Sequence, residues 1–485
     1  MTAATDSVTI DFIDVASVSP DADALARIPR TLALRHDVLS IASDDNHLTI
    51  ALPDAADHDV IERVRLITGM HVRAYSAPRE AIRAKLSTVY AHAQAAHHDD
   101  EAPAIRAVDD IHERALRHGA SDIHVEPTRS GGRVRQRVDG ILSETRDLHS
   151  ELYGQVVSRM KLLAGMDIAD RRQPQDGRYA IDRNGRSVDA RVSSMPTILG
   201  EKLVVRLLDH EMRVPSVDSL GMPARTLKDF LRAVHAPHGF VVVCGPTGSG
   251  KTTTLYAALR ERDADSENLC SIEDPVEVRI PGVAQIQVNP RAGLTFGTAL
   301  RSFLRQDPNV IMVGEMRDAE TAAIAASASL SGQLVLTTLH SNDAPKAIDR
   351  LVELGVSNHT ISAGLSAVIA QRLVRRLCEA CREPFAVSAE LARQFGVSSG
   401  MRAYKPAGCG ACAGTGFSGR AAIFESLYVH DSLRRLIAQG ASSVEIADAA
   451  RSAGYESMLV HGVERVLAGE TTFDELRRVL VVQQQ

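Results

Sequence analysis

The chain has 485 residues, of which 44% are hydrophobic and 24% are charged, and its formal net charge is -6. This length suits about three domains, and the composition excludes a chain that is disordered throughout. The negative charge excludes a generally basic nucleic-acid binder. No apolar run approaches the roughly 20 residues that a membrane helix needs, and the first residues lack the basic flank and apolar core of a signal peptide. The sequence therefore predicts a cytoplasmic protein.

Residues 1–95 alternate short apolar runs with amphipathic stretches, which predicts a small α/β domain. The polar residues 43–47, SDDNH, predict a hairpin turn between its first two strands. The stretch 91–103 has no periodicity, and residues 96–103 are predicted to form a linker. The strands are expected at 38–42, 48–52 and 72–75, and the helices at 22–35, 57–68 and 78–90.

Two further domains are predicted after the linker. Residues 104–218 form an arginine-rich α/β domain, with helices at 111–117 and 152–163 and strands at 123–126 and 133–138. From residue 219, apolar strands alternate with helical stretches, which predicts a mainly parallel sheet covered on both faces. This third domain ends with a cysteine-marked insert at 378–412 and a helical tail over 425–485. Its strands are expected at 240–244, 269–272, 310–313 and 333–338.

Residues 245–252, GPTGSGKT, fit the P-loop pattern between a predicted strand and a helix at 253–260. The backbone N–H groups of such a loop and the positive end of the helix dipole receive phosphate oxygens. Lys251 would reach the β- and γ-phosphates, and the Thr252 hydroxyl would bind Mg²⁺. The predicted nucleotide site consists of Gly245, Pro246, Thr247, Gly248, Ser249, Gly250, Lys251, Thr252 and Thr253.

Carboxylates follow two of the predicted strands. Glu315 ends the run VIMVGE and is the candidate base that orients or deprotonates the attacking water. Gly314 stands at the position of the usual Walker-B aspartate, so Mg²⁺ is expected to be held through water or by another acid. Glu273, Asp274 and Glu277, in SIEDPVE, could supply that acid. Any one of these carboxylates could instead be a solvated loop residue.

Other candidates flank the acidic strand. His340, in TTLHSND, could sense phosphate or be structural. Arg301 and Arg305 share one face of a predicted helix, and Arg317 follows Glu315. These arginines could stabilise the transition state as arginine fingers or only pair with acids.

Two cysteine pairs, Cys378-x-x-Cys381 and Cys409-x-x-Cys412, supply the four thiolates that tetrahedral Zn²⁺ requires. Two disulfides are the alternative, which a cytoplasmic location disfavours. Four cysteine ligands leave no open position, so the metal is expected to stabilise the insert without taking part in chemistry. Two further cysteines lie in strand-like runs and are predicted to be core residues: Cys244 and Cys270.

The motifs GPTGSGKTT, SIEDPVE, IMVGEMRD and TTLHSND, in this order, resemble those of the secretion ATPase superfamily, which drives type II secretion and type IV pilus assembly. In the second domain, SDIHVEP, RVRQRVDGIL, RRQPQDGRY, VDARVS and GEKLVVRLLD resemble the PAS-like domain that precedes the family's motor. The resemblance covers about residues 104–485.

This resemblance implies a RecA-like P-loop ATPase that forms a homohexamer and uses ATP and Mg²⁺. The domain before the motor is expected to rock against it as nucleotide is bound and hydrolysed. Arg178 and Arg191 occupy positions from which this domain contacts nucleotide phosphates, and Arg350 and Arg420 match arginines at the nucleotide or subunit boundary. The tetracysteine insert is typical of secretion and pilus extension motors, and it disfavours pilus retraction.

The compact region 1–95 resembles the domain with which type II secretion ATPases dock onto the cytoplasmic domain of a bitopic inner-membrane protein. The expected function is assembly of a periplasmic pseudopilus by an ATPase held at the inner membrane through this protein and a platform protein. A pilus extension motor is the alternative. A more remote alternative is a nucleic-acid translocase whose arginine-rich residues 133–137 contact the phosphate backbone. It is disfavoured because the chain has no tryptophan and only 4% aromatic residues to stack on bases. A non-enzymatic zinc scaffold is a further alternative.

Overall fold

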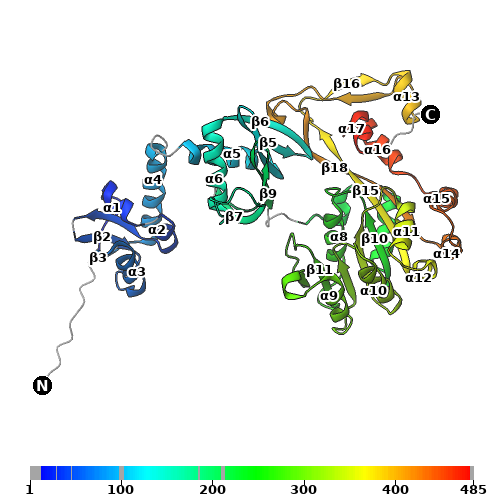
Figure 1. Cartoon of the computed structure of the whole chain (residues 1–485), viewed down its shortest axis with the longest axis horizontal. Helices are drawn as coiled ribbons and strands as arrows, with labels where there is room; N and C mark the ends of the chain where they lie inside the picture. Colours follow the sequence, from blue (N-terminus) through cyan, green and yellow to red (C-terminus); the bar gives the residue numbers. More distant parts are fainter. Residues whose placement is uncertain are drawn as a thin grey trace. The chain divides into compact units, whose positions relative to one another are not determined.

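The computed structural model describes residues 12–28, 30–44, 46–97, 103–183, 186–208 and 214–480. Backbone contacts divide the chain into two compact units, Met1–Asp109 and Asp110–Gln485. Figure 1 labels many of the helices and strands, which are numbered in chain order. Among the described residues, no helix has both the length and the apolar character needed to cross a membrane.

The first unit has a three-stranded sheet in the order β1-β2-β3. The first two strands are antiparallel, which confirms the predicted hairpin, and the last two are parallel. The predicted helix 22–35 is divided in two, because Pro29 lies inside it and Ile28 takes an extended conformation with ψ 124°. The elements are α1 (Ala22–Arg27), α2 (Arg30–His36), β1 (Leu39–Ser43), β2 (His47–Leu52), α3 (His58–Thr68), β3 (His71–Ser76) and α4 (Arg79–His97).

Two helices reach into the stretch that was predicted to be a linker, residues 96–103. Helix α4 continues to His97, and α5 (Pro103–Arg117) begins where the linker was expected to end. Residues 98–102 lie outside the described residues. The alanine-rich run after Tyr90 has high helix propensity although it lacks an apolar stripe, which explains the difference.

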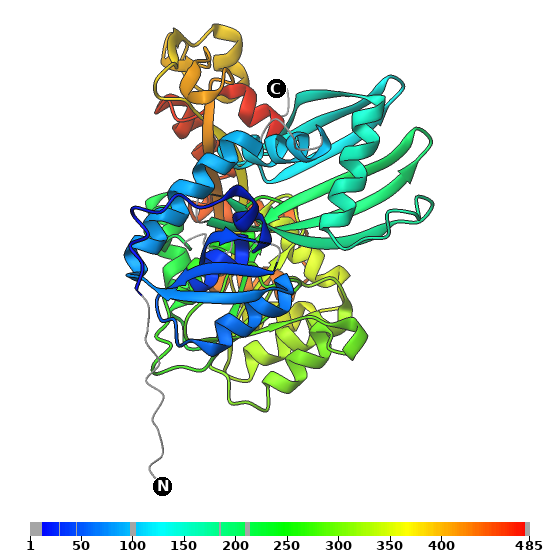
Figure 2. The ribbon, with the colours of Figure 1, turned by 90° about the vertical axis from the view of Figure 1, so that its left-hand side faces the viewer.

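The second unit begins with a six-stranded antiparallel sheet in the order β6-β5-β4-β9-β8-β7. Helix α6 (Ser150–Leu163) packs across one face of this sheet and buries Tyr153, Val156 and Met160 (Figure 2). The strands are β4 (Asp122–Thr128), β5 (Gly131–Val138), β6 (Ile141–His149), β7 (Gln175–Arg183), β8 (Arg186–Thr197) and β9 (Gly200–Leu208).

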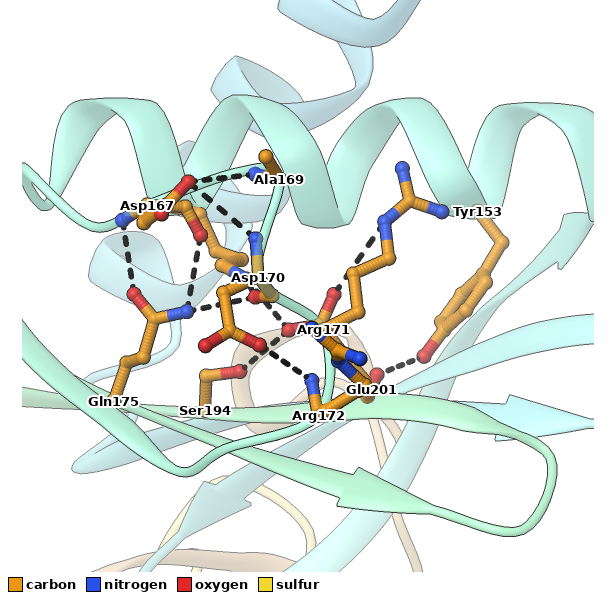
Figure 3. A network of polar contacts seen from close by, with 10 residues as sticks. Tyr153, Asp167, Ala169, Asp170, Arg171, Arg172, Gln175, Ser194 and Glu201 are labelled. Atoms are coloured by element: carbon orange, nitrogen blue, oxygen red, sulfur yellow. Dashed lines mark hydrogen bonds and ion pairs between the residues drawn. The ribbon is translucent and has the colours of Figure 1, made fainter.

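A polar network fixes the connection from α6 to β7 (Figure 3). The Nζ of Lys161, which is only 1% exposed, donates to the Glu201 carboxylate at 2.6 Å and to the Asp170 carbonyl oxygen at 2.7 Å. The side-chain amide of Gln175 donates to the same carbonyl oxygen at 2.8 Å. Because a buried charge is stable only when it is paired, this network holds the loop that leads into the strand carrying Arg178.

The rest of the second unit is built on a seven-stranded sheet in the order β12-β11-β13-β14-β10-β15-β18. All neighbouring strands are parallel except β15 and β18, which confirms the predicted mainly parallel sheet. The strands are β10 (Gly239–Cys244), β11 (Leu269–Glu273), β12 (Val283–Gln287), β13 (Val310–Val313), β14 (Leu334–Leu339), β15 (Leu365–Leu377) and β18 (Phe417–Tyr428).

Both faces of this sheet are covered. Along β10, Phe240, Val242 and Cys244 belong to one buried cluster, and Val241 and Val243 belong to another. Because successive strand side chains point to opposite faces, these clusters lie on the two sides of the sheet. Their helices are α7 (Ala224–Val234), α8 (Lys251–Arg260), α9 (Phe296–Phe303), α10 (Ala319–Leu330), α11 (Ala344–Glu353) and α12 (Asn358–Gly364), with short 3₁₀ turns at Val217–Leu220 and Pro290–Ala292.

The insert and the tail complete the unit. The insert contains β16 (Glu383–Ala386), α13 (Ala389–Phe395), β17 (Arg402–Lys405) and the 3₁₀ turn Gly410–Cys412. The tail begins at Asp431 and not at residue 425, because β18 stays paired with β15 up to Tyr428. Its helices are α14 (Asp431–Ala438), α15 (Ser443–Ser452), α16 (Met458–Leu467) and α17 (Phe473–Val479).

Candidate active site and metal centre

The P-loop connects β10 to α8 at the carboxyl edge of the parallel sheet, where α/β proteins bind ligands. Gly248 and Gly250 have φ angles of 76° and 87°, a conformation that glycine adopts without strain. A Cβ atom on Gly245 would lie 2.6 Å from the carbonyl oxygen of Gln371. The loop can therefore take this path only with glycine at these positions, while Pro246 and Thr247 stay exposed.

Lys251 lies folded back into the loop. Its Nζ donates to the carbonyl oxygens of Gly245 and Pro246 at 2.9 Å each. Burial lowers the pKa of Lys251, and the negative charge of Glu315 partly opposes this shift. The next two residues, Thr252 and Thr253, lie half-buried in the first turn of α8.

Gln371 on β15 braces the loop and was not predicted from the sequence. Its side-chain nitrogen donates to the Ser249 carbonyl oxygen at 2.6 Å, and its side-chain oxygen accepts from the Thr254 hydroxyl at 2.8 Å. The Gln371 side chain is 1% exposed, so both bonds are shielded from water. No local pattern reveals this role, because the contact joins residues far apart in the sequence.

Glu315 follows β13 and its side chain is 16% exposed. One carboxylate oxygen lies 2.5 Å from Nη2 of Arg317, and the other lies 3.7 Å from Nε2 of His340. The structure thus brings together three of the predicted residues at the carboxyl edge of the sheet. The hydrogen bond that Arg317 donates to Glu315, together with the negative charges of Glu315 and Asp274, raises the pKa of the Arg317 guanidinium.

Gly314 occupies a narrow space between β13 and β11. Its amide donates to the Ile272 carbonyl oxygen at 2.8 Å, and a Cβ atom would lie 3.2 Å from the same oxygen. An aspartate at this position would therefore crowd the neighbouring strand, which accounts for the glycine in place of the usual Walker-B acid.

The acids of SIEDPVE have different surroundings. Glu273 is 2% exposed, and its carboxylate accepts hydrogen bonds from Ser271 at 2.6 Å, from Gln285 at 3.1 Å and from the Tyr256 hydroxyl. These donors fix its carboxylate in the protein. Asp274 is exposed, next to Arg317.

Glu277 links this region to the preceding domain. Glu277 is exposed to solvent, yet partial desolvation and then the charge of Glu273 raise the pKa of its carboxyl group. The positive charges of Arg206 and Arg191 oppose the shift. Two arginines of the six-stranded sheet thus act electrostatically on the motif SIEDPVE, residues 271–277.

These arginines belong to a row across three strands. Arg178 on β7 pairs in register with Arg191 on β8, which pairs with Arg206 on β9. Residues directly opposite one another share a face of the sheet. Arg206, whose Nε lies 3.1 Å from the Asp122 carboxylate, was not predicted, although the alternation within GEKLVVRLLD could have placed it on this face.

The other predicted arginines have partners elsewhere in the chain. Arg301 pairs with Glu320, and Arg305 donates to the Arg301 carbonyl oxygen at 3.0 Å, so neither is the partner of Glu315 in this structure. The two arginines that the resemblance names are also paired. Nη1 of Arg350 lies 2.7 Å from Oε2 of Glu353, and Nε of Arg420 lies 3.8 Å from Oδ1 of Asp139.

The four insert cysteines converge, and their Sγ atoms lie within 4.8 Å of one another. The separations are 3.9 Å for Cys378–Cys409, 3.8 Å for Cys381–Cys412 and 3.8 Å for Cys409–Cys412. Tetrahedral zinc with Zn–S bonds of about 2.3 Å requires sulfur atoms about 3.8 Å apart. A disulfide has sulfurs about 2.0 Å apart. The geometry therefore fits Zn²⁺ and not two disulfides.

Two family descriptions match the chain: Type II/IV secretion system protein over residues 97–478 and MshEN domain over residues 9–96. Type II secretion system protein HxcR of Pseudomonas aeruginosa is 47% identical over 380 residues, which cover 78% of each chain. Type II secretion system ATPase E of Vibrio cholerae is 44% identical, and the match covers 79% of this chain and 76% of the Vibrio protein. Type IV pilus assembly ATPase PilB of Myxococcus xanthus is 36% identical, and the match covers 96% of this chain and 88% of the Myxococcus protein.

A solved structure of the pilus retraction motor PilT with bound ADP matches the fold with a TM-score of 0.52. It is 24% identical and covers 77% of this chain and 96% of that chain, so it shows the fold alone. Three observations indicate the same family: the order of the motifs, the P-loop beside Glu315, and the similarity over most of the sequence. The chain belongs to the type II/IV secretion system protein family, and it is one of the ATPases of that family.

Proposed function

We propose that the chain is a cytoplasmic, hexameric, Mg²⁺-dependent ATPase that powers pseudopilus assembly for type II protein secretion. The observation that carries the catalytic part is the position of Glu315. Its carboxylate lies at the carboxyl edge of the sheet, its charge acts on the Lys251 ammonium, Arg317 pairs with one of its oxygens, and His340 lies near the other. A carboxylate so placed can orient the water that attacks the γ-phosphate.

The other residues have distinct roles in this proposal. The backbone of the P-loop binds the phosphates of ATP, and Lys251 leaves its two carbonyl partners to reach the β- and γ-phosphates. Mg²⁺ bound at the Thr252 hydroxyl would neutralise charge on these phosphates, with exposed Asp274 as the acid that completes its shell through water. Glu273 keeps its protein partners, and Glu277 faces the arginines of the preceding domain.

The arginines complete the site through the motion of the domains. Arg178 and Arg191 approach the phosphates when the six-stranded sheet rocks against the motor. Arg301, Arg305 and Arg317 would stabilise transition-state charge as arginine fingers, for which Arg301 and Arg305 would leave their present partners. Arg350 and Arg420 would lie at the nucleotide or subunit boundary of the homohexamer. Substitution of Arg178 or Arg191 is then expected to slow ATP turnover without weakening the binding of nucleotide by the P-loop.

The first unit docks onto the cytoplasmic domain of a bitopic inner-membrane protein, which holds the motor at the membrane beside a platform protein. Similarity to HxcR and to secretion ATPase E, at 47% and 44% identity, favours secretion. A pilus extension ATPase is the second candidate, because PilB is similar over 96% of this chain, which includes the first unit.

Zinc bound by Cys378, Cys381, Cys409 and Cys412 would hold the two ends of the insert together. The amides of Cys409 and Gly416 each donate to the Cys412 sulfur at 3.1 Å, which stabilises a thiolate ligand there. With four protein ligands the site is structural.

The catalytic proposal is tested by Glu315→Gln, which keeps the size of the side chain and removes its charge. Nucleotide binding, measured with a fluorescent ADP analogue, is expected to stay, because the P-loop is intact. Turnover, measured as phosphate release, is expected to fall by about 10²–10⁴-fold. Glu62→Gln, at an exposed glutamate of the first unit that pairs with Arg65, is the matched control and is expected to hydrolyse normally. Wild-type turnover in Glu315→Gln contradicts the assigned role.

The partner is tested by capture from detergent-solubilised membranes of the source cell on the immobilised full chain. A bitopic secretion protein among the bound proteins, identified by mass spectrometry, supports secretion. Recovery of pilus-assembly proteins instead supports the second candidate and leaves the catalytic assignments unchanged.

A further inference from the structure

A buried glutamate, Glu425 on β18, joins the starts of two helices. It is 4% exposed. One carboxylate oxygen accepts the amide hydrogen of Ala344 at 2.7 Å, and the other accepts that of Met458 at 2.8 Å. These two residues are the first of α11 and of α16. A single carboxylate therefore satisfies amide groups that have no partner within their own helices.

Helix α11 directly follows the motif TTLHSND, residues 337–343, which we call the histidine box. The segment between β14 and α11 consists of His340, Ser341, Asn342 and Asp343. At its far end, Glu425 holds Ala344. In its middle, the Arg372 guanidinium donates to the Asn342 carbonyl oxygen at 2.7 Å. The segment that carries His340 is thus fixed by two buried charged side chains from β15 and β18.

These contacts extend to the catalytic candidates. The hydroxyl of Thr338, two residues before His340, donates to the Gly314 carbonyl oxygen at 2.7 Å, and Nε2 of His340 lies 3.7 Å from the Glu315 carboxylate. On β15, Arg372 is adjacent to Gln371, which braces the P-loop. A displacement of the start of α11 would therefore move His340 relative to Glu315.

The surroundings of Glu425 act on its charge in opposite directions. Burial, and to a smaller extent the negative charge of Asp343, raise the pKa of its carboxyl group, while the two amides and the Tyr455 hydroxyl favour the charged form. The two amide hydrogens are donated one to each oxygen, which is the pattern of a carboxylate. Hydrogen bonds to a charged acceptor are about twice as strong as those between neutral groups. Loss of this charge would leave two buried amides with weaker partners.

We propose that Glu425 is a positioning residue for ATP hydrolysis. It sets the place of the histidine box beside Glu315 and ties this place to α16, so that the start of α16 and the catalytic edge of the sheet move together. This inference rests on the proposed function, because it requires Glu315 and His340 to act in hydrolysis.

The test is Glu425→Gln in the full chain, since the amide nitrogen cannot accept a hydrogen bond and one helix start loses its partner. The kcat is expected to fall roughly 10- to 100-fold, because small misplacements of catalytic groups have effects of this size. The KM for ATP is expected to stay within about twofold, since the P-loop is held separately by Gln371. Both are measured at 25 °C, below the melting temperature of each variant.

The matched control is Glu475→Gln. Glu475 is also buried, with 2% of its surface exposed. It anchors another tail helix, α17, to β15, because Nη2 of Arg375 donates to its carboxylate at 2.7 Å. This variant is expected to melt at a lower temperature and to keep the wild-type kcat. An equal loss of kcat in both variants, or a wild-type kcat in Glu425→Gln, overturns the proposal.

Two further variants keep the outcomes separate. If Glu425→Gln does not fold, Glu425→Asp replaces it, because the shorter side chain keeps the charge and cannot reach both amides, and the same result is expected. Glu315→Gln is assayed in parallel. Its full activity would contradict the proposed function, whereas an inactive Glu315→Gln beside a fully active Glu425 variant overturns only the role of Glu425.

Discussion

The residues of the candidate site differ in how far the sequence could reveal them. Lys251, Thr252 and Glu315 follow from local patterns, because a P-loop and a strand-end acid are each contiguous in sequence. The Gln371 brace could not be predicted, since it contacts Thr254 from 117 residues away and lies in an ordinary apolar strand. The pairing of Arg301 with Glu320 was also invisible, because both are surface residues on separate helices.

The role of Gln371 can be tested with Gln371→Leu, which has a similar size. The substitution leaves the Ser249 carbonyl oxygen and the Thr254 hydroxyl buried without their partner, at a cost of about 1–3 kcal/mol each. We expect a lower melting temperature and weaker binding of a fluorescent ADP analogue. Gln439→Leu, at an exposed position after α14, is the control. Wild-type affinity and melting temperature in Gln371→Leu would show that the loop holds its shape unaided.

At the scale of elements, strands were predicted more closely than helix ends. The run 310–313 matches β13, because an apolar stretch between polar residues is buried on both faces of a parallel sheet. The helix predicted at 22–35 failed at Pro29, and α4 extended to His97 through alanine-rich sequence. Periodicity reports the buried stripe of a helix and not its ends, where single residues decide.

Removal of the metal is expected to act on one element, the insert 378–412. Cys378→Ser, or treatment with a zinc chelator, removes the tie between its two ends, so hydrogen exchange and proteolysis are expected to increase there first. Metal content, measured by mass spectrometry of the protein, is expected to fall. Cys270→Ser, at a buried cysteine outside the cluster, keeps its zinc. An unchanged metal content in Cys378→Ser would exclude this cysteine as a ligand.

For the molecule as a whole, the chain divides into two compact units, to which the proposed function gives separate roles. The first unit has a hydrophobic core of its own, which includes Leu39, Ile50 and Ile82. All the candidate catalytic and metal-binding residues lie in the second unit. The sequence predicted a separate α/β domain before the motor, although it could not place the end of α4.

Deletion of residues 1–102 is therefore expected to leave kcat unchanged while it removes binding to the membrane partner. The deletion ends just before α5, so the helix stays whole. Phosphate release and co-sedimentation with membranes measure the two activities. A chain without residues 1–102 that still binds these membranes would place the docking surface in the second unit.

The row of Arg178, Arg191 and Arg206 has a consequence for energy transfer. Neighbouring strands are about 4.8 Å apart, well inside the Debye length of roughly 8 Å at physiological salt, so these like charges repel one another across the sheet. An approaching triphosphate would cancel part of this repulsion. The six-stranded sheet would then be more stable with nucleotide against it than without. Departure of phosphate would restore the repulsion within the sheet, so the stability of the six-stranded sheet would follow the nucleotide state of the motor.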